Sequence, residues 1–302
     1  MKVLVTGAGG TLGKALAPML ADAGHEPVLQ DVRELQTPYE FIQGDVRNPE
    51  DVLVAARGVE MIVHTAAIHG IHLRSHSPRD FYDLNLTGTF NVWEAAVEAD
   101  VRGVVFSSTM GVYGESRRPA SEDAVVPLHE HLPLLPGDIY GWTKMAGEEL
   151  GKLYERTYGI PSIALRYGMF VPEPFFRYGI RLLYGGVDTH DVACSVMASM
   201  EALTSGRIIR DAFNVESVVP FTEEDGSQLR NDPLPVLDKY YPDASDLLRE
   251  RGVERLTPIR EYYPMRHAEE VLDFQPTCTF DRWLEELKSR PEERVEKSPP
   301  WP

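Results

Sequence analysis

Two groups of residues far apart in the sequence have the types and spacing needed for chemistry, and the first is a proton-transfer pattern. Tyr140 and Lys144 lie four residues apart, downstream of Ser107-Ser108-Thr109. A tyrosine hydroxyl normally ionises near pH 10, too high for a base at neutral pH. A lysine one helical turn away would favour the phenolate and lower the tyrosine pKa. The pattern predicts that Tyr140 transfers a proton while Thr109 holds the reacting hydroxyl, although such pairs also occur by chance on exposed helices.

The second group is a glycine-rich turn near the start of the sequence. The apolar run Val3-Leu4-Val5 leads directly into Thr6 to Gly13. Glycines in such a turn let the backbone approach a pyrophosphate, whose charge then faces the N–H groups of the following helix. The residues expected to contact the dinucleotide there are Gly7, Gly10, Thr11, Leu12 and Gly13. A tight turn between two elements is the simpler interpretation of the glycines alone.

Asp31 favours the dinucleotide interpretation. It ends the second predicted strand, 18 residues after Gly13, where a carboxylate accepts hydrogen bonds from the adenosine ribose hydroxyls. A 2′-phosphate beside Asp31 would meet like charge, so NAD is favoured over NADP. Arg33 lies close enough to weaken this preference.

The elements that must position these residues alternate between β-rich runs and helical periodicity. This order is typical of an α/β fold with a Rossmann-type, doubly wound parallel sheet. Strands are predicted at 2–6, 27–30, 40–43, 60–64, 102–107, 161–166 and 209–215, and helices at 12–23, 49–57, 79–99, 138–158, 190–204, 233–250, 265–272 and 280–288. The carboxyl ends of the strands would then form one crevice that contains Thr109 and Tyr140.

The domain organisation follows from the same pattern. We predict an NAD-binding domain over 1–168, to which 187–215 returns. A smaller mixed substrate-binding region is expected at 169–186 and 216–290. The charged, proline-rich stretch 291–302 is predicted to be a disordered tail.

Composition narrows the class of protein. The chain has 302 residues, 43% of them hydrophobic, and a net charge of −17, which argues against nucleic acid as the partner. No run approaches the ~20 apolar residues that cross a bilayer. Cys194 and Cys278 show no metal-binding spacing, so we expect two reduced, buried thiols in a cytoplasmic protein.

A group of four histidines, His64, His69, His72 and His76, begins at the last residue of the fourth predicted strand. Their spacing fits no common zinc site, and no cysteine or carboxylate pair completes a ligand set. We therefore predict no metal. A loop beside the cofactor is favoured, with His69 or His72 at the substrate entrance.

Taken in order, the motifs resemble the extended short-chain dehydrogenase/reductase family, the NAD-dependent sugar epimerases and dehydratases related to UDP-glucose 4-epimerase. The resemblance covers about residues 1–215. Beyond Thr6 to Gly13 and the Tyr140/Lys144 pair, its motifs match Asp45-Val46, His64-Thr65-Ala66-Ala67, Asn85 to Thr89, Ser107 to Gly114 and Asp191-Val192-Ala193. The resemblance implies catalytic roles for Thr109, Tyr140 and Lys144. It also implies that the cofactor is contacted by Asp45, Val46, Thr65, Ala66, Ala67, Asn85, Ser107, Tyr140, Lys144 and Tyr167.

The departures from the family pattern concern the substrate. Met169 stands where the family usually has a substrate-contacting asparagine, and the segment between Pro172 and Asp191 is short. Met110-Gly111 replace the Asp-Glu pair of dehydratases, which counts against elimination chemistry. The predicted substrate residues are His69, Thr109, Met110, Met169 and Arg177. Arg177, Arg181, Arg255 and Arg260 are candidates for a phosphate, although surface arginines are the simpler interpretation.

These observations favour an NAD-dependent epimerase acting on a sugar or sugar nucleotide. The alternative is an NAD-dependent dehydrogenase of a small sugar, uronate or related alcohol, and a third is a non-catalytic NAD-sensing protein. The resemblance implies a homodimer that pairs helices 79–99 and 138–158. No membrane or nucleic-acid partner is expected.

Overall fold

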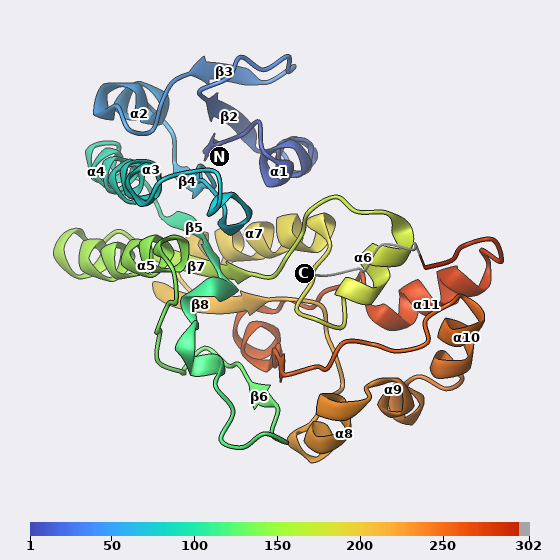
Figure 1. The fold of residues 1–302 in the computed structure, drawn as a ribbon. Helices are drawn as coiled ribbons and strands as arrows, with labels where there is room; N and C mark the ends of the chain where they lie inside the picture. The colour runs from blue at the N-terminus through green and yellow to red at the C-terminus, as the bar shows by residue number, and fades with distance from the viewer. Residues whose placement is uncertain (296–302) are drawn as a thin grey trace.

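The computed structural model describes residues 1–295 and is built around a seven-stranded parallel sheet (Figure 1). Its order is β3-β2-β1-β4-β5-β7-β8, with every pairing parallel. The strands are β1 (Lys2–Thr6), β2 (Glu26–Asp31), β3 (Glu40–Gln43), β4 (Met61–His64), β5 (Val104–Thr109), β7 (Ser162–Tyr167) and β8 (Arg210–Val215). The predicted Rossmann-type fold is confirmed. Thr109 is the last residue of β5, whereas the sequence predicted that it would follow the strand.

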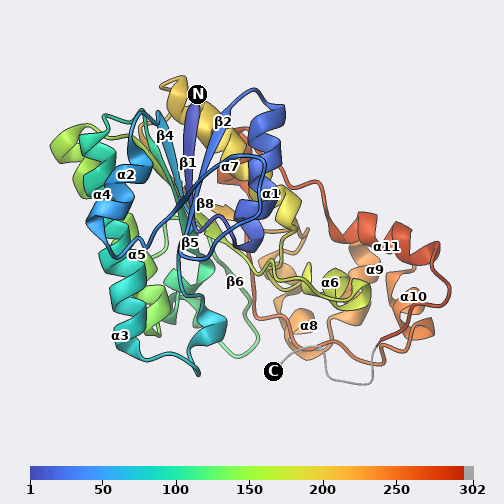
Figure 2. The same cartoon turned by 90° about the horizontal axis from the view of Figure 1, so that it is seen from above.

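Helices cover both faces of the sheet, which is why central strands such as β1 read as continuous apolar runs. On one face lie α1 (Thr11–Asp22) and α7 (Thr189–Thr204), which share a buried cluster with the sheet. On the other lie α2 (Pro49–Ala56), α4 (Gly88–Glu98) and α5 (Ile139–Tyr158). Figures 1 and 2 show these two layers on opposite sides of the strands. The predicted helices in these regions are confirmed to within one or two residues, apart from 79–99.

The predicted helix 79–99 is wrong as a single α-helix. It consists of α3 (Pro78–Phe81), a π-helical turn over Tyr82–Thr87, and α4. A π-helical turn inserts an extra residue into the helical repeat and often marks a functional site. Here it contains Asn85, whose buried side chain binds the backbone of Ile68 in a neighbouring loop. Apolar periodicity alone gives no signal for such an insertion.

The C-terminal part forms a smaller lobe with its own apolar core, to one side of the sheet (Figure 2). It contains α6 (Phe175–Arg181), α8 (Gly226–Asn231), α9 (Leu234–Tyr240), α10 (Ala244–Glu250), α11 (Phe280–Lys288) and a two-stranded sheet of β6 (Val126–Pro127) and β9 (Glu261–Tyr262). The predicted helix 233–250 is divided between α9 and α10, because Pro242 follows α9 and Asp243 adopts a left-handed φ of 64°. Helices α6 and α8 and the small sheet were not predicted from the sequence.

The boundary between the two lobes also differs from the prediction. Met265, Ala268, Leu272 and Phe274 pack in the core of the main sheet rather than in the C-terminal lobe. The helix predicted at 265–272 includes a π-helical turn over Ala268–Leu272.

The chain end and the cysteines complete the comparison. In the predicted tail 291–302, the Val295 N–H donates to the Arg251 carbonyl at 2.9 Å, whereas 296–302 lie outside the described residues. Cys194 and Cys278 are free but only half-buried, which differs from their predicted burial. Within residues 1–295, no helix combines the length and the apolar character needed to cross a membrane.

Candidate active site

A single cavity of about 1130 Å³ opens at the carboxyl ends of the central strands. It brings together most of the residues that the sequence predicted for a cofactor and a substrate. The lining includes Gly7, Gly10, Thr11, Leu12, Asp31, Asp45, Val46, Thr65, Ala66, Ala67, His69, Ser107, Thr109, Met110, Tyr140, Lys144, Tyr167 and Met169. Three predicted residues, Gly13, Asn85 and Arg177, do not line it.

The glycine turn forms one wall of this cavity. Gly7 has a φ of +67°, and a Cβ there would lie 2.6 Å from Ala66 Cα, so the turn leaves no room for a side chain. Gly10 begins α1 without a side-chain cap, which leaves the first N–H groups of the helix available to an anion. A Cβ on Gly13 would lie 2.5 Å from Ala8 Cα, so Gly13 allows α1 to pack against the turn.

Asp31 lies at the adjacent strand end and is held firmly. Its Oδ2 accepts the Gly9 N–H at 2.9 Å, and its Oδ1 accepts the Arg33 N–H at 3.0 Å and Nε–H at 3.3 Å. The uncapped helix start, the side-chain-free turn and this carboxylate together suit the pyrophosphate and ribose of a dinucleotide. The residues present therefore fit NAD.

A first prediction concerns the coenzyme preference. Asp31→Ala removes a carboxylate that would accept hydrogen bonds from the ribose, and we expect NAD affinity to fall by at least about tenfold. NADP affinity should fall less, because its phosphate is no longer repelled. Calorimetric titration of both coenzymes checks this. The matched control is Arg33→Met, which removes the exposed partner of Asp31 but keeps the Asp31 carboxylate. Equal losses for NAD and NADP would remove Asp31 from coenzyme selection.

The predicted proton-transfer residues are positioned by the close approach of α5 to β5. Gly141 and Gly147 permit it: a Cβ on Gly141 would lie 2.6 Å from the Gly111 carbonyl oxygen, and one on Gly147 would lie 2.4 Å from the Phe106 ring. Asp138 caps the helix by accepting the Gly141 N–H at 2.8 Å. Tyr140, in the first turn of α5, therefore reaches the end of β5, where Thr109 hydrogen-bonds its side chain.

The charges around Tyr140 can be compared with the sequence prediction. Burial raises the pKa of Tyr140 to about 12, and the hydrogen bond from Thr109 only partly opposes this. Lys144 is not among the groups that shift the Tyr140 pKa, and its predicted effect, exerted together with a bound nicotinamide ring, stays a prediction. The Lys144 Nζ donates to the Ser107 carbonyl oxygen at 2.7 Å and lies 5.1 Å from the centre of the Phe106 ring. Burial lowers the pKa of Lys144 itself to about 7.

The lowered lysine pKa predicts a pH-dependent stability. The pKa of Lys144 is about 7 in the folded chain and 10.5 when exposed, so between these pH values the unfolded chain binds more protons. Its contribution to folding stability therefore rises with pH across that window. We expect the unfolding free energy of wild type minus that of Lys144→Met to increase from neutral to alkaline pH in urea titrations without added NAD. A difference that stays constant would contradict the lowered pKa.

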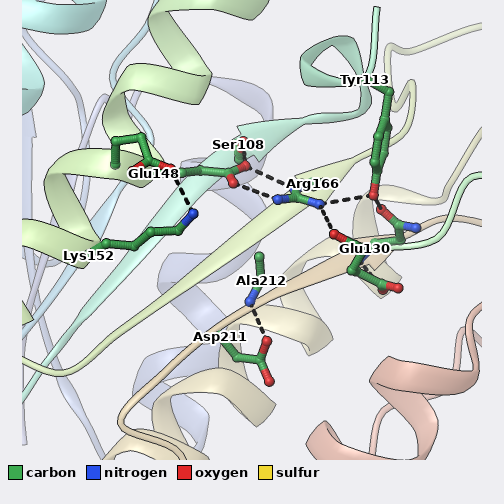
Figure 3. Close-up of polar contacts among 10 residues, drawn as sticks. Ser108, Tyr113, Glu130, Glu148, Lys152, Arg166, Asp211 and Ala212 are labelled. Atoms are coloured by element: carbon green, nitrogen blue, oxygen red, sulfur yellow. Dashed lines mark hydrogen bonds and ion pairs between the residues drawn. The ribbon is translucent and has the colours of Figure 1, made fainter. Parts of the chain in front are cut away.

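A buried polar network behind the cavity locks these elements together (Figure 3). Glu148 on α5 accepts the Ser108 hydroxyl hydrogen at 2.5 Å and pairs with Arg166 on β7, with Nε–Oε1 at 3.0 Å and Nη2–Oε2 at 2.7 Å. Arg166 also donates to the Tyr113 hydroxyl at 3.1 Å, and that hydroxyl donates to Asn214 on β8 at 2.6 Å. The sequence analysis missed this network, although Glu148 lies one helical turn beyond Lys144.

At the end of the cavity where the sequence predicts the substrate, the structure adds Arg117, which the sequence analysis also missed. Arg117 lines the cavity, donates to the Met110 carbonyl oxygen at 2.6 Å and forms an ion pair with Glu261. Arg181, a candidate phosphate ligand, is instead buried, paired with Glu173 and hydrogen-bonded to the Met169 carbonyl. Its role is to hold the loop after β7.

The other candidate arginines stand apart from the cavity. Arg177, Arg255 and Arg260 do not line it, and Arg255 donates to the Asn231 carbonyl at 3.3 Å. The predicted substrate role of Arg177 is therefore not supported by the lining.

The histidine group divides into two sets. His64 is buried in the sheet between the hydroxyls of Thr6, at 2.7 Å, and Thr89, at 3.0 Å, and burial lowers its pKa to about 3. His69, His72 and His76 line the cavity, whereas His64 is the last residue of β4 and does not belong to the predicted loop beside the cofactor. The described part of the chain holds no group of side chains suited to a metal ion.

Asn85 acts from behind this loop. Its side chain accepts the Ile68 N–H at 2.7 Å, donates to the Ile68 carbonyl at 2.9 Å and donates to Thr143 on α5 at 3.3 Å. It fixes the loop against α5 rather than lining the cavity, which differs from its predicted contact with the cofactor.

Known proteins share the sequence features that form this cavity. Residues 3–173 match the NAD dependent epimerase/dehydratase family. A putative UDP-glucose 4-epimerase of Methanocaldococcus jannaschii is 31% identical over 173 residues, which cover 55% of this chain and 54% of that protein. A uronate dehydrogenase of Pseudomonas syringae pv. tomato is 31% identical over 180 residues, covering 57% and 61%. The chain thus matches little more than half the length of these relatives.

Solved structures resemble almost the whole chain. A short-chain dehydrogenase/reductase superfamily protein from Agrobacterium tumefaciens with bound NAD gives a TM-score of 0.72 at 21% identity, covering 96% of this chain and 97% of that one. This likeness concerns the fold. Because the family match extends over more than half of the sequence, the chain belongs to the NAD-dependent epimerase/dehydratase family.

Proposed function

We propose that this protein is an NAD-dependent enzyme that oxidises a hydroxyl-bearing carbon of a compact sugar or sugar acid. The observation that carries the proposal is the meeting of two sets of residues in one cavity. The glycine turn and Asp31 form one part of its wall, and Thr109, Tyr140 and Lys144 form another. Each set is a weak signal alone, whereas together they match the needs of alcohol oxidation.

Each residue has a defined role in this proposal. Tyr140 takes the proton of the substrate hydroxyl, and Thr109 orients that hydroxyl through its side chain. Lys144, fixed by the Ser107 carbonyl, supplies a cation beside the cofactor site. NAD, when bound, would accept the hydride of the substrate carbon and bring a positive ring that lowers the Tyr140 pKa from its raised value.

A compact substrate is favoured by the limits of the cavity. Its lining ends at Pro172, and no described residue beyond that point contributes. Pockets for a single small ligand are typically about 300–1,000 Å³, so a cavity of about 1130 Å³ leaves modest room beside a dinucleotide. Arg117 is the arginine at the substrate end, next to Met110, and it suits the carboxylate of a uronate.

A sugar-nucleotide epimerase is the second candidate. It is favoured by the relatives named UDP-glucose 4-epimerase, which match this chain about as well as the uronate dehydrogenases do. Both activities share the first oxidation step. They differ in whether the substrate is released oxidised or is reduced again on its other face.

One experiment tests the proposal and separates the two activities. The purified protein is incubated with NAD and, separately, with panels of free aldoses, uronates and UDP-sugars, while NADH absorbance and product stereochemistry are followed. Net NADH with a free sugar or uronate supports the proposed dehydrogenase. Epimerised UDP-sugar without net NADH supports the second candidate, and neither product with any panel member would overturn both.

The same family relationship supports a homodimer formed through α4 and α5. Phe90 on α4 and Trp142 and Leu153 on α5 are large apolar side chains that remain 44%, 39% and 46% exposed. Apolar groups that remain exposed on neighbouring helices are typical of an interface. We expect Phe90→Glu to shift the protein toward monomer in sedimentation velocity, whereas Ile209→Glu, at an exposed position next to β8, should not. A wild type that sediments as a monomer would remove the proposal.

A further inference from the structure

A buried glutamate lies directly behind the cavity wall, at the proposed substrate end. Glu216 is the first residue after β8 and is 0% exposed. Gly168, the first residue after β7, lines the cavity, whereas Glu216 does not. A Cβ on Gly168 would overlap the Glu216 Oε2, so no side chain can separate the two residues. The Glu216 carboxyl therefore packs against the backbone of a residue that forms the cavity wall.

The surroundings of this carboxyl favour its neutral form. Neither of its oxygens has a hydrogen-bond partner in the described part of the chain. A buried carboxylate without partners is costly, and burial raises the pKa of the Glu216 carboxyl well above its usual range. The Glu261 carboxylate adds to this rise, and the Arg117 and Arg181 cations only partly oppose it. Tyr263 also faces Glu216, but burial raises the pKa of its hydroxyl, so it adds no charge.

The charges around Glu216 balance without it. Arg117 forms an ion pair with Glu261 on β9, and Arg181 on α6 forms one with Glu173. Two cations and two anions therefore cancel. An ionised Glu216 would be an unbalanced negative charge in this group, whereas a protonated Glu216 leaves it neutral.

Arg117 is the cation of this group that lines the cavity. A guanidinium has five N–H donors. The described residues take two of them, because one Nη1–H donates to Glu261 and one Nη2–H donates to the Met110 carbonyl oxygen. Three donors therefore remain for a ligand in the cavity. Arginine donors of this kind suit a carboxylate, which accepts two of them side by side.

We propose that Glu216 is a specificity-determining residue, which keeps a proton behind Gly168 so that Arg117 can bind the carboxylate of a sugar acid. The inference rests on the proposed function and narrows its substrate class to sugars that carry a carboxylate. Such a substrate brings one negative charge to Arg117. An ionised Glu216 would place a second negative charge beside it, and like charges in a desolvated site repel strongly. A neutral sugar would not experience this repulsion.

The direction of the pH dependence follows from this arrangement. Below the raised pKa of Glu216, the carboxyl is neutral and a sugar acid binds well. As the pH rises through that pKa, the carboxyl loses its proton and the Kd of the sugar acid increases. The Kd of a neutral sugar should not follow this change.

The first test measures substrate affinity by calorimetry, with the protein saturated with NADH so that no oxidation occurs. A uronate and the neutral aldose of the same stereochemistry are titrated at neutral pH and at the highest pH at which the protein remains folded. We expect the uronate Kd of wild type to rise at least about tenfold and the aldose Kd to change less than about twofold. In Glu216→Gln the uronate Kd should stay within about twofold, because an amide does not ionise. Glu254→Gln, at an exposed position outside the cavity, is the matched control and should behave as wild type.

The second test observes the proton itself, without substrate or cofactor. Infrared spectra of wild type at neutral pH should contain the carbonyl stretch of a protonated carboxyl. Glu216→Gln should lack this band and Glu254→Gln should retain it. NADH affinity should be equal in the three proteins, which shows that the cavity is intact. Should Glu216→Gln not fold, the pH dependence of the uronate Kd in wild type still decides.

The outcomes separate the inference from the proposed function. A uronate Kd that does not rise with pH in wild type, a rise that Glu216→Gln shares, or the absence of the infrared band overturns the inference alone. A protein that oxidises neutral aldoses but binds no uronate does the same. A wild type that forms no NADH with any free sugar or uronate overturns the proposed function, and the substrate role of Glu216 with it.

Discussion

Replacing Tyr140 with phenylalanine is expected to lower kcat by about 10²–10⁴-fold while NAD affinity changes little. The variant removes only the phenolic oxygen that accepts the substrate proton. The ring keeps its contacts, because it packs against Gly70 and lies 6.3 Å from the Phe81 ring, centre to centre. Steady-state kinetics on the substrate identified by the panel, together with calorimetric NAD titration, measure the two effects.

Tyr158→Phe is the matched control for this prediction. Tyr158 is the last residue of the same helix, is 53% exposed and does not line the cavity. Its loss should change kcat by no more than a few-fold. If Tyr140→Phe retains a kcat within a few-fold of wild type, Tyr140 is not the base.

Among single changes in the buried polar network behind the cavity, replacing Glu148 with alanine should be the most destabilising. The Glu148–Arg166 pair is almost completely buried, with side chains 2% and 4% exposed. Removal of the carboxylate leaves the Arg166 guanidinium buried without its counter-charge, which typically costs about 3–5 kcal/mol. We expect a fall of this size in the unfolding free energy from urea titration.

The neighbouring ion pair on the same helix provides the control. Glu149 pairs with Lys152 at 2.7 Å, but both side chains are exposed, at 58% and 41%. Glu149→Ala should change stability by less than about 1 kcal/mol. The double variant Glu148→Leu/Arg166→Met should recover much of the loss, because apolar residues can replace a buried pair. A Glu148→Ala variant as stable as Glu149→Ala would contradict the role of the network.

The main sheet and the cofactor side of the cavity were predictable because their physical requirements are local. The turn at Gly7 needs a residue without a side chain beside Ala66, and such a requirement appears directly in the sequence. A strand buried on both faces reads as a continuous apolar run, as in Val3-Leu4-Val5. The alternating order of strands and helices then determines that the carboxyl ends of the strands lie at the same edge of the sheet.

The substrate end was not predictable, because its residues are brought together by contacts between distant segments. Arg117 lies in a short turn and owes its position to Glu261, which is 144 residues away. From the sequence, Arg181 resembles a surface arginine. In the structure it is buried and donates to the Met169 carbonyl oxygen, which holds the loop after β7. The raised Tyr140 pKa likewise comes from burial, which residue spacing alone does not determine.

The most direct test of the central claim is an ultraviolet difference spectrum of the tyrosinate band at about pH 9, a unit below the ordinary tyrosine pKa. Without NAD, the Tyr140 pKa of about 12 keeps the hydroxyl protonated, and wild type and Tyr140→Phe should give the same spectrum. With saturating NAD, the account predicts a tyrosinate signal in wild type that Tyr140→Phe lacks. If NAD binds but no such signal appears, or if it appears equally in Tyr140→Phe, then Tyr140 does not face the bound cofactor.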